Sequence, residues 1–318
     1  MDEEEVPKSV TERVMDGVPT MKPLPYQLRL KIAPHPGQPW EALCGAVIVS
    51  PRHALTAYHC IGNKDGRIIP NKYFTVYAGA YNFKNLTSDK NVQKRGVLRP
   101  FPLKFKNGSR YNIVPDLAVL LLDEPLQMNE FVTPACLPTK EVPMNEECIV
   151  SGWGKTVSYS LSSSATLRAA TVLTSKLQHC SHMDKMDDGT RIPVGDYDLC
   201  TYHPTKSACQ GDSGGPLVCK TNGGATLYGV VSRGLPCNPH DPNVKYGLYG
   251  NVYHFKDEIE ALIGIDNPCP TNENYYADEF CDGNLNNSEN CFDGGDCCGA
   301  EANYEYCNSY NQECKCRA

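Results

Sequence analysis

Long apolar runs are missing from this 318-residue chain. No run approaches the ~18 residues that a helix needs to cross a bilayer, so we expect no membrane span. Long basic runs are missing too, and the net charge is -7, which argues against nucleic acid as a partner. Residues 1–7 are acidic and contain no apolar stretch, so they do not form a secretory signal peptide.

Cysteine, in contrast, is abundant. The chain has 17 cysteines, which would be a liability in a reducing cytosol but form disulfides in a secreted protein. Two glycosylation sequons, at Asn85 (N-L-T) and Asn107 (N-G-S), agree with this location, although such triplets also occur by chance. We therefore expect a secreted, extracellular protein.

Three segments carry residues suited to nucleophilic catalysis. Ser213 lies in C-Q-G-D-S-G-G-P-L, His59 in L-T-A-Y-H-C, and Asp116 at the start of D-L-A-V-L-L-L. A serine hydroxyl is a weak nucleophile until a base takes its proton, and that base needs a carboxylate to orient it. Each segment alone also has an ordinary interpretation, as a glycine-rich turn or a buried histidine.

Together, in the order His, Asp, Ser, the segments resemble the trypsin/chymotrypsin serine proteases. The resemblance runs from about Val14 to Ile265 and includes C-I-V-S-G-W-G, V-S-R-G and Y-G-L-Y. It implies an all-β fold of two antiparallel six-stranded barrels with a C-terminal helix. It also implies a serine endopeptidase that needs no cofactor for catalysis and that meets polypeptide substrates, an activating protease and protein inhibitors.

The resemblance assigns the catalytic roles. His59 is the general base, Asp116 orients its ring, and Ser213 is the nucleophile. The backbone amides of Gly211 and Ser213 would form the oxyanion hole, where small residues let the chain come close to the substrate.

Substrate preference follows from residues that match the family's specificity pocket. Ser207 stands where trypsin-like relatives carry an aspartate, so the pocket floor is uncharged. Ser232, Gly234 and Gly247 match other substrate-binding positions, and the two glycines leave the pocket open. We expect a large apolar side chain before the scissile bond. Arg233 replaces a tryptophan common in the family, so further subsites are expected to favour acidic groups.

Activation is expected at the bond between Arg13 and Val14. In the family, such a cut frees an apolar N-terminus whose ammonium pairs with the aspartate beside the nucleophile, here Asp212. A buried carboxylate without its counter-charge is strongly unfavourable, so the uncut chain would be a zymogen. The alternative is that residues 1–13 are only a disordered leader.

Matching to the family also implies four disulfides, a connectivity that spacing alone could not provide. Cys136, in P-A-C-L-P, is left over and either stays free or pairs outside this sequence. The implied pairs are Cys44 with Cys60, Cys148 with Cys219, Cys180 with Cys200, and Cys209 with Cys237.

Local patterns agree with a β-rich fold. Short runs rich in Leu, Val, Ile and Tyr, broken by Gly, Pro and Asn, predict antiparallel strands. The clearest are 27–32, 43–49, 73–78 and 117–122, and a second set follows over about 140–250. Residues 253–263 repeat apolar residues at helical spacing and predict a closing helix.

The tail has a different composition. Residues 269–316 contain eight cysteines in 48 residues and almost no aliphatic core, so only cross-links could fold them. Their centre resembles the Notch-repeat (LNR) module, a small disulfide-rich unit built around Ca²⁺. The oxygen donors would be Asp282, Asn286, Asp293 and Asp296.

Two alternatives compete with that interpretation of the tail. An EF-hand fails because Asn287 occupies the required glycine position. An acidic turn held by disulfides without metal remains open.

We therefore expect an activation peptide at 1–13, a protease domain at 14–265 and an LNR-like domain at 268–318. The alternative function is a protease-fold binding or adhesion protein whose catalysis is weak or lost, because activity belongs to a site and not to a fold.

Overall fold

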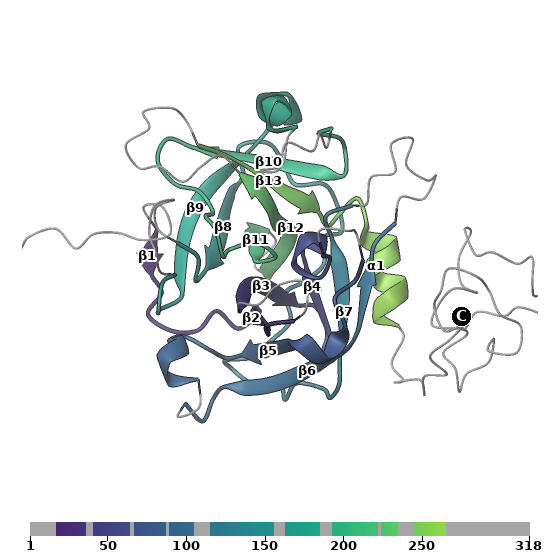
Figure 1. Cartoon of the computed structure of the whole chain (residues 1–318). Coiled ribbons are helices and arrows are strands. Elements are labelled where there is room, and N and C mark those ends of the chain that lie inside the picture. Colours follow the sequence, from purple (N-terminus) through teal and green to yellow (C-terminus); the bar gives the residue numbers. More distant parts are fainter. Residues whose placement is uncertain are drawn as a thin grey trace, which may run out of the picture. The chain divides into compact units, whose positions relative to one another are not determined.

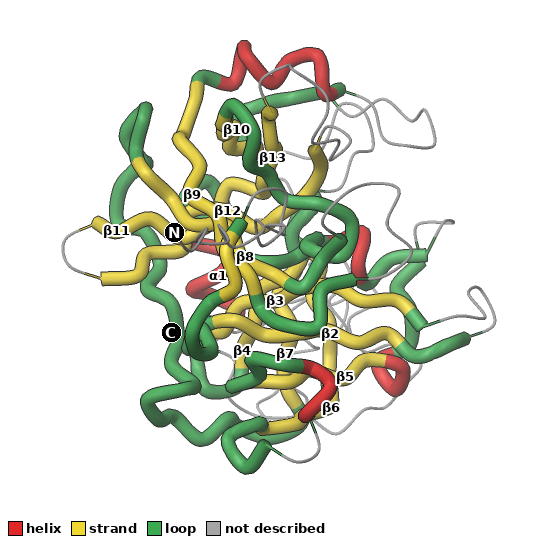
Figure 2. Tube along the Cα trace, turned by 90° about the vertical axis from the view of Figure 1, so that its left-hand side faces the viewer, coloured by secondary structure: helices red, strands yellow, loops and turns green. Residues whose placement is uncertain are grey.

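The computed structural model describes residues 17–35, 41–63, 67–86, 89–104, 115–155, 163–184, 193–221, 224–234 and 245–264. Apart from Lys104 and residues 260–264, these belong to one compact unit of the chain. Strands, yellow in Figure 2, make up most of its regular structure, and the helices, in red, are short.

The first half of the chain closes into a six-stranded antiparallel barrel (Figure 1). Around the barrel the order is β2, β3, β4, β7, β6, β5, and β5 pairs with β2 to close it. The strands are β2 (Gln27–Ile32), β3 (Ala42–Ile48), β4 (His53–Thr56), β5 (Phe74–Ala78), β6 (Gln93–Pro102) and β7 (Ala118–Leu122).

The side-chain pattern of these strands explains why they form a barrel. In β5, Phe74, Val76 and Ala78 are buried while the residues between them are partly exposed, which is the alternation of a strand with one face on a core. β7 is the apolar run A-V-L-L-L, and all five residues are buried. In the barrel it lies between β4 and β6, with both of its faces buried.

The second half forms another closed ring of six antiparallel strands. Its order is β8, β9, β10, β13, β12, β11, and β11 returns to β8, while β1 adds to β9. The strands are β1 (Val18–Pro19), β8 (Glu147–Gly152), β9 (Arg168–Ser175), β10 (Asp198–His203), β11 (Pro216–Thr221), β12 (Gly224–Gly234) and β13 (Lys245–Asn251).

Short helices join these strands. The α-helix α1 (Lys256–Ile263) follows β13, begins with the acidic residues Asp257 and Glu258, and buries Ile259. Acidic residues in a first turn favour the helix because they face its positive end. The 3-10 helices are η1 (Tyr58–Cys60), η2 (Asn71–Tyr73), η3 (Phe83–Asn85) and η4 (Leu177–Met183).

The two barrels contact each other through β2, β3, β8 and the segment before β11. The hydroxyl of Ser151, on β8, donates a 2.7 Å hydrogen bond to the side chain of Gln27 on β2, and both are buried. A Cβ on Gly45 would lie 2.6 Å from the Cα of Gly215, so glycine lets the two backbones approach.

The fold prediction is confirmed for both barrels and for the C-terminal helix. The tail lies outside the described residues. None of the helices in the described ranges is long and apolar enough to cross a membrane.

Candidate active site

The pairing of β4 with β7 brings His59 and Asp116 together. The strands are antiparallel with Thr56 opposite Ala118, so the end of β4 lies beside the start of β7. His59 follows β4 in η1, and Asp116 comes just before β7. His59 Nδ1 lies 2.9 Å from Asp116 Oδ2 and 3.1 Å from Oδ1, and the His59 amide donates to Oδ1 at 2.9 Å. The carboxylate therefore holds both the ring and the backbone of His59.

Electrostatics reinforce this arrangement. Burial by itself raises the pKa of Asp116, but the charge and hydrogen bonds of His59 and a hydrogen bond from Ser232 outweigh burial and hold the pKa at about 2. Burial by itself lowers the pKa of His59, but Asp116 outweighs it, and the pKa is raised above its ordinary 6.5. At neutral pH an ionised Asp116 is thus ready to stabilise a proton on His59.

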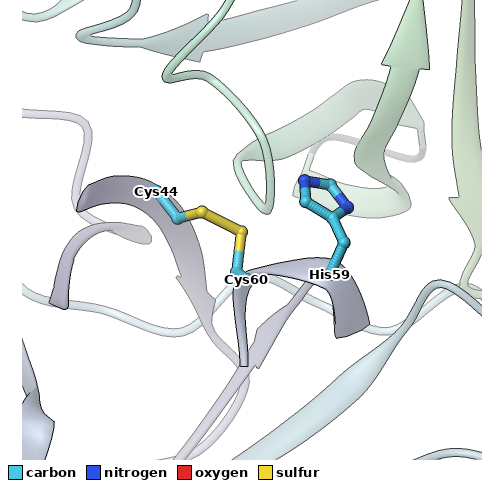
Figure 3. A group of neighbouring side chains, drawn as sticks. All are labelled: Cys44, His59 and Cys60. Carbon is cyan, nitrogen blue, oxygen red and sulfur yellow. A yellow bond between two sulfur atoms is a disulfide. The ribbon is translucent and has the colours of Figure 1, made fainter. Parts of the chain in front are cut away.

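The second barrel brings Ser213 to the same region. The carbonyl of Ser213 accepts a 2.7 Å hydrogen bond from the amide of Gly45. Gly45 follows Cys44, and Cys44 is bonded to Cys60, the neighbour of His59. Figure 3 shows the imidazole ring beside that disulfide. Ser213 is thus tied through β3 and one cross-link to the turn that carries His59.

Of the two contacts expected in the predicted triad, the one between His59 and Asp116 is formed. Within the described part of the chain, no hydrogen bond joins the hydroxyl of Ser213 to Nε2 of His59. Such bonds are often long or poorly aligned in a protein without substrate.

Cys44, His59 and Cys60 also have the spacing of a metal site, because their donor atoms lie within 4.8 Å of one another. Both sulfurs, however, are bonded to each other in the disulfide. One imidazole nitrogen remains, which is too few ligands to hold an ion.

Two glycines beside Ser213 have an unusual backbone conformation. Gly211 and Gly214 have φ of 96° and 78°, in the region that favours glycine. The amides of Asp212, Gly214 and Gly215 all donate to carbonyls of the protein. Among the hydrogen bonds of the described residues, the amides of Gly211 and Ser213 are not donors. These are the two amides that were predicted to form the oxyanion hole.

Asp212 is a buried acid whose charge is not balanced in the described part of the protein. It is 1% exposed, and its oxygens accept from the amides of Gly154 at 2.7 Å and Cys209 at 2.9 Å. Burial raises the pKa of Asp212 to about 6 despite these hydrogen bonds. No salt bridge to Asp212 occurs among the residues that the structure describes.

Two of the residues predicted to line the specificity pocket lie on neighbouring strands. Gly234 and Gly247 are direct partners across β12 and β13. A Cβ on Gly247 would meet the ring of Tyr249 at 3.1 Å, whereas the nearest atom to a Cβ on Gly234 would be 3.8 Å away. Ser207 is 6% exposed, and its hydroxyl donates to the carbonyl of Ala208 at 3.0 Å.

Two neighbouring residues on β12 make side-chain contacts that were not predicted. The hydroxyl of Ser232 donates to Asp116 Oδ2 at 2.5 Å, so its side chain helps to hold the carboxylate that contacts His59. The side chain of Arg233 is 9% exposed and lies 3.2 Å from Asp198. The expectation that Arg233 favours acidic substrate groups is therefore wrong in its premise, because its charge is paired inside the protein. Nothing local in the sequence indicates either contact.

Disulfides in the structure follow the implied scheme as far as it is described. Cys209 is disulfide-bonded, but Cys237 lies outside the described residues. Cys136 is a free, exposed cysteine. The bonded pairs are Cys44 with Cys60, Cys148 with Cys219, and Cys180 with Cys200.

Several expected sites also lie outside the described residues. Asn85 ends η3, but its side chain is not among those described. The others are Arg13, Val14, Asn107, Asp282, Asn286, Asp293 and Asp296.

Comparison with known proteins agrees with this geometry. The family model described as Trypsin matches residues 17–259. Kallikrein-15 of Homo sapiens is 31% identical over 247 residues, covering 73% of this chain and 88% of that relative. Coagulation factor IX of Oryctolagus cuniculus is 32% identical over 234 residues, covering 68% of this chain and 78% of the relative. With this likeness and the His59–Asp116 arrangement, the chain belongs to the trypsin family and is a serine endopeptidase.

Proposed function

We propose that this protein is a secreted serine endopeptidase that uses His59, Asp116 and Ser213 as its triad. It is made as a zymogen and prefers a large apolar residue before the scissile bond. The observation that carries the proposal is the 2.9 Å contact between His59 Nδ1 and Asp116 Oδ2. The backbone of Ser213 is hydrogen-bonded to Gly45, which belongs to the same barrel as His59 and Asp116.

Each step assigns one proton or bond. His59 Nε2 takes the proton of Ser213 Oγ as that oxygen attacks the substrate carbonyl carbon. The amides of Gly211 and Ser213 bind the resulting oxyanion. His59 then gives the proton to the leaving amine, and a water molecule releases the acyl group by the same route in reverse. Asp116 stays ionised throughout, so the imidazolium is stabilised at every step. The residues do this chemistry without a metal or organic cofactor.

Activation depends on Asp212. Its burial and raised pKa support the idea that it awaits a cation. A new ammonium at Val14, freed by an activating protease that cuts after Arg13, would supply it. The amide of Gly211 lies next to Asp212 in the chain. An ion pair between Asp212 and the new ammonium would therefore also fix the position of this oxyanion-hole amide.

The uncharged Ser207 and the paired glycines Gly234 and Gly247 support a preference for Phe, Tyr, Leu or Met. An acidic floor would be needed to bind Lys or Arg by charge pairing. The paired charge of Arg233 adds no free cation to this region.

We propose the domain boundaries 1–13, 14–265 and 268–318, with the last an LNR-like module that binds Ca²⁺. Its residues Asp282, Asn286, Asp293 and Asp296 supply oxygen ligands. The disulfides support a secreted protein, and the sequons at Asn85 and Asn107 support its glycosylation. Titration of the full chain with Ca²⁺ in a calorimeter should show binding that Asp293→Ala abolishes and Asp123→Ala leaves intact. Equal binding by Asp293→Ala would remove the metal from the proposal.

The main experiment is to cut the protein at Arg13-Val14 and measure turnover of matched amide substrates with Phe or Arg before the scissile bond. We expect Phe cleavage, none in Ser213→Ala, and none in the uncut protein. Arg cleavage would keep the mechanism and overturn the pocket assignment. Turnover by the uncut chain would overturn the zymogen. Turnover of neither substrate, with a correct new N-terminus, would favour the binding or adhesion protein.

A further inference from the structure

A buried ion pair lies behind the proposed triad. Arg233 on β12 contacts Asp198, the first residue of β10, with 3.2 Å between Nη2 and Oδ2. The two side chains are 9% and 4% exposed. Asp198 also accepts from the amide of Gly195 at 3.3 Å. A pair this far from water is screened little, so its charges act on their neighbours.

The guanidinium has a partner for each of its nitrogens. Nε donates to the carbonyl of Met183 at 3.1 Å, Nη2 donates to Asp198, and Nη1 lies 3.4 Å from the hydroxyl oxygen of Ser232. These contacts come from η4, β10 and β12, so three elements hold Arg233 in one orientation.

A bulge in β12 explains how consecutive side chains meet. The pairing with β13 shifts from Val231 with Tyr249 to Arg233 with Leu248, which leaves Ser232 as the extra residue. Neighbouring side chains on a regular strand point to opposite faces, and a bulge breaks this alternation.

The direction of the hydrogen bonds follows from the chemistry of the groups. A guanidinium only donates, so the oxygen of Ser232 must accept from Arg233. The single proton of that hydroxyl is then left for Asp116, to which Ser232 donates at 2.5 Å. The chain of contacts runs from Asp198 through Arg233 and Ser232 to Asp116.

We propose that the Arg233–Asp198 ion pair positions Ser232 and Asp116 for catalysis and tunes the basicity of His59. Arg233 and Asp198 are positioning residues, since neither touches the reacting atoms. This inference rests on the proposed triad. It assigns Arg233 a role inside the protein instead of in a substrate subsite.

The electrostatic effects agree in sign. The charge of Arg233 lowers the pKa of His59, although Asp116 outweighs it. Burial raises the pKa of Asp198 to about 6, Arg233 opposes that rise, and Asp116 adds to it. Arg233 is thus a cation between two carboxylates, and we expect Asp198 to offset part of its effect on His59.

The tyrosines near the chain of contacts do not titrate in the acid range. Burial raises the pKa of Tyr58, beside Asp116, and of Tyr197, in the loop before β10. Burial also raises the pKa of Tyr249, on β13, to about 12. On η4, His179 and His182 contact Tyr246.

The test is the pH dependence of kcat/KM in the protein cut at Arg13-Val14. Its acid limb reports the base of the free enzyme. Arg233→Met removes the cation, so the limb should move to higher pH. Asp198→Asn removes the offsetting anion, so the limb should move to lower pH. Opposite shifts from the two halves of one pair are not expected from structural damage.

A conservative variant separates charge from geometry. Arg233→Lys keeps the cation but loses the fork, so its limb should match the wild type while its plateau kcat falls about tenfold, the loss expected for one hydrogen bond. As a matched control, Lys31→Met and Glu41→Gln break an ion pair whose side chains are 37% and 43% exposed, and should shift nothing.

The outcomes separate this inference from the triad proposal. If the wild type has an acid limb and both Arg233→Met and Asp198→Asn leave it in place, the inference is overturned. If Ser213→Ala is as active as the wild type, the triad itself fails. Should the single variants not fold, the neutral pair Arg233→Met/Asp198→Asn decides. A plateau kcat lowered about tenfold at unchanged KM supports the role, and a wild-type kcat overturns it.

Discussion

At the scale of single residues, Asp116 is the most constrained group in the candidate site. It accepts hydrogen bonds from the ring and the amide of His59 and from the hydroxyl of Ser232. These donors all favour the ionised carboxylate, which is why its pKa falls to about 2 although burial acts against it. Activity is therefore not limited by protonation of Asp116 near neutral pH.

Replacing this carboxylate should disrupt the tautomer of His59. In Asp116→Asn the side chain keeps its shape, but an amide NH₂ can face Nδ1 and move the ring proton to Nε2. We expect kcat to fall about 10³- to 10⁴-fold in the cleaved protein. The control Asp123→Asn, in a surface turn, should stay close to wild type. A loss below tenfold for Asp116→Asn would contradict the assigned role.

The pH profile tests His59 directly. The neutral ring is the base, so activity is lost as the pH falls through the pKa of folded His59. Because Asp116 raises that pKa above 6.5, the acid limb of kcat/KM should have its midpoint above pH 6.5. The measurement is kcat/KM for one amide substrate from pH 5 to 9. A midpoint below 6.5 would show that burial outweighs Asp116.

At the scale of elements, one disulfide joins the strand beside Ser213 to the turn of His59. Cys44 lies in β3 and Cys60 in η1, with 16 residues of separation. The bond therefore contributes to both stability and geometry, because the neighbouring Gly45 holds the carbonyl of Ser213.

Removing the Cys44–Cys60 disulfide should lower activity, unlike removing a disulfide far from the candidate site. We expect Cys44→Ala/Cys60→Ala to lose about 3 kcal/mol of unfolding free energy and much of its kcat. The comparison is Cys148→Ala/Cys219→Ala, which opens a loop of 71 residues within the second barrel. It should cost about 4 kcal/mol but leave kcat per active site intact. Urea unfolding and active-site titration measure both. Equal losses of kcat would argue against a geometric role for Cys44–Cys60.

At the scale of the whole described unit, the site depends on two barrels that each supply part of it. His59 and Asp116 belong to the first barrel, while Ser213 precedes β11 of the second. The buried hydrogen bond between Ser151 and Gln27 is one of the contacts between them. Loss of the Ser151 hydroxyl would leave the buried side-chain oxygen of Gln27 without a donor.

A double-mutant cycle tests that contact. Ser151→Ala and Gln27→Met should each cost about 1 to 3 kcal/mol, because each leaves a buried polar group unsatisfied. The double variant should cost less than the sum, with a coupling of about 1 kcal/mol. Ser181→Ala, which removes an exposed hydroxyl from η4, should change stability by less than about 0.5 kcal/mol. Strict additivity in urea unfolding would mean that the two residues do not act together.

Much of this architecture was readable in the sequence because the signals are local. The strand at 27–32 matches β2 residue for residue, and the helix predicted at 253–263 contains all of α1 but begins three residues too early. The missed β6 contains Pro100 and Pro102, which lack an amide donor and are unusual inside a strand. Its pairing with β7 is bulged between Val97 and Arg99, so its residues follow no regular alternation.

Through its resemblance to the family, the sequence by itself determined the class of fold, the candidate nucleophile, general base and orienting carboxylate, and the residues proposed to line the pocket. Each lies in a short segment that resembles the family, and the segments point to one chemistry only when they are taken together. Only the tertiary structure decided that Ser232 donates a hydrogen bond to Asp116 and that Arg233 pairs with Asp198. Those contacts join residues 116 and 35 positions apart, and they depend on a bulge that changes where two side chains point. Side-chain direction at a bulge is set by strand register, which long-range packing decides and no local pattern encodes.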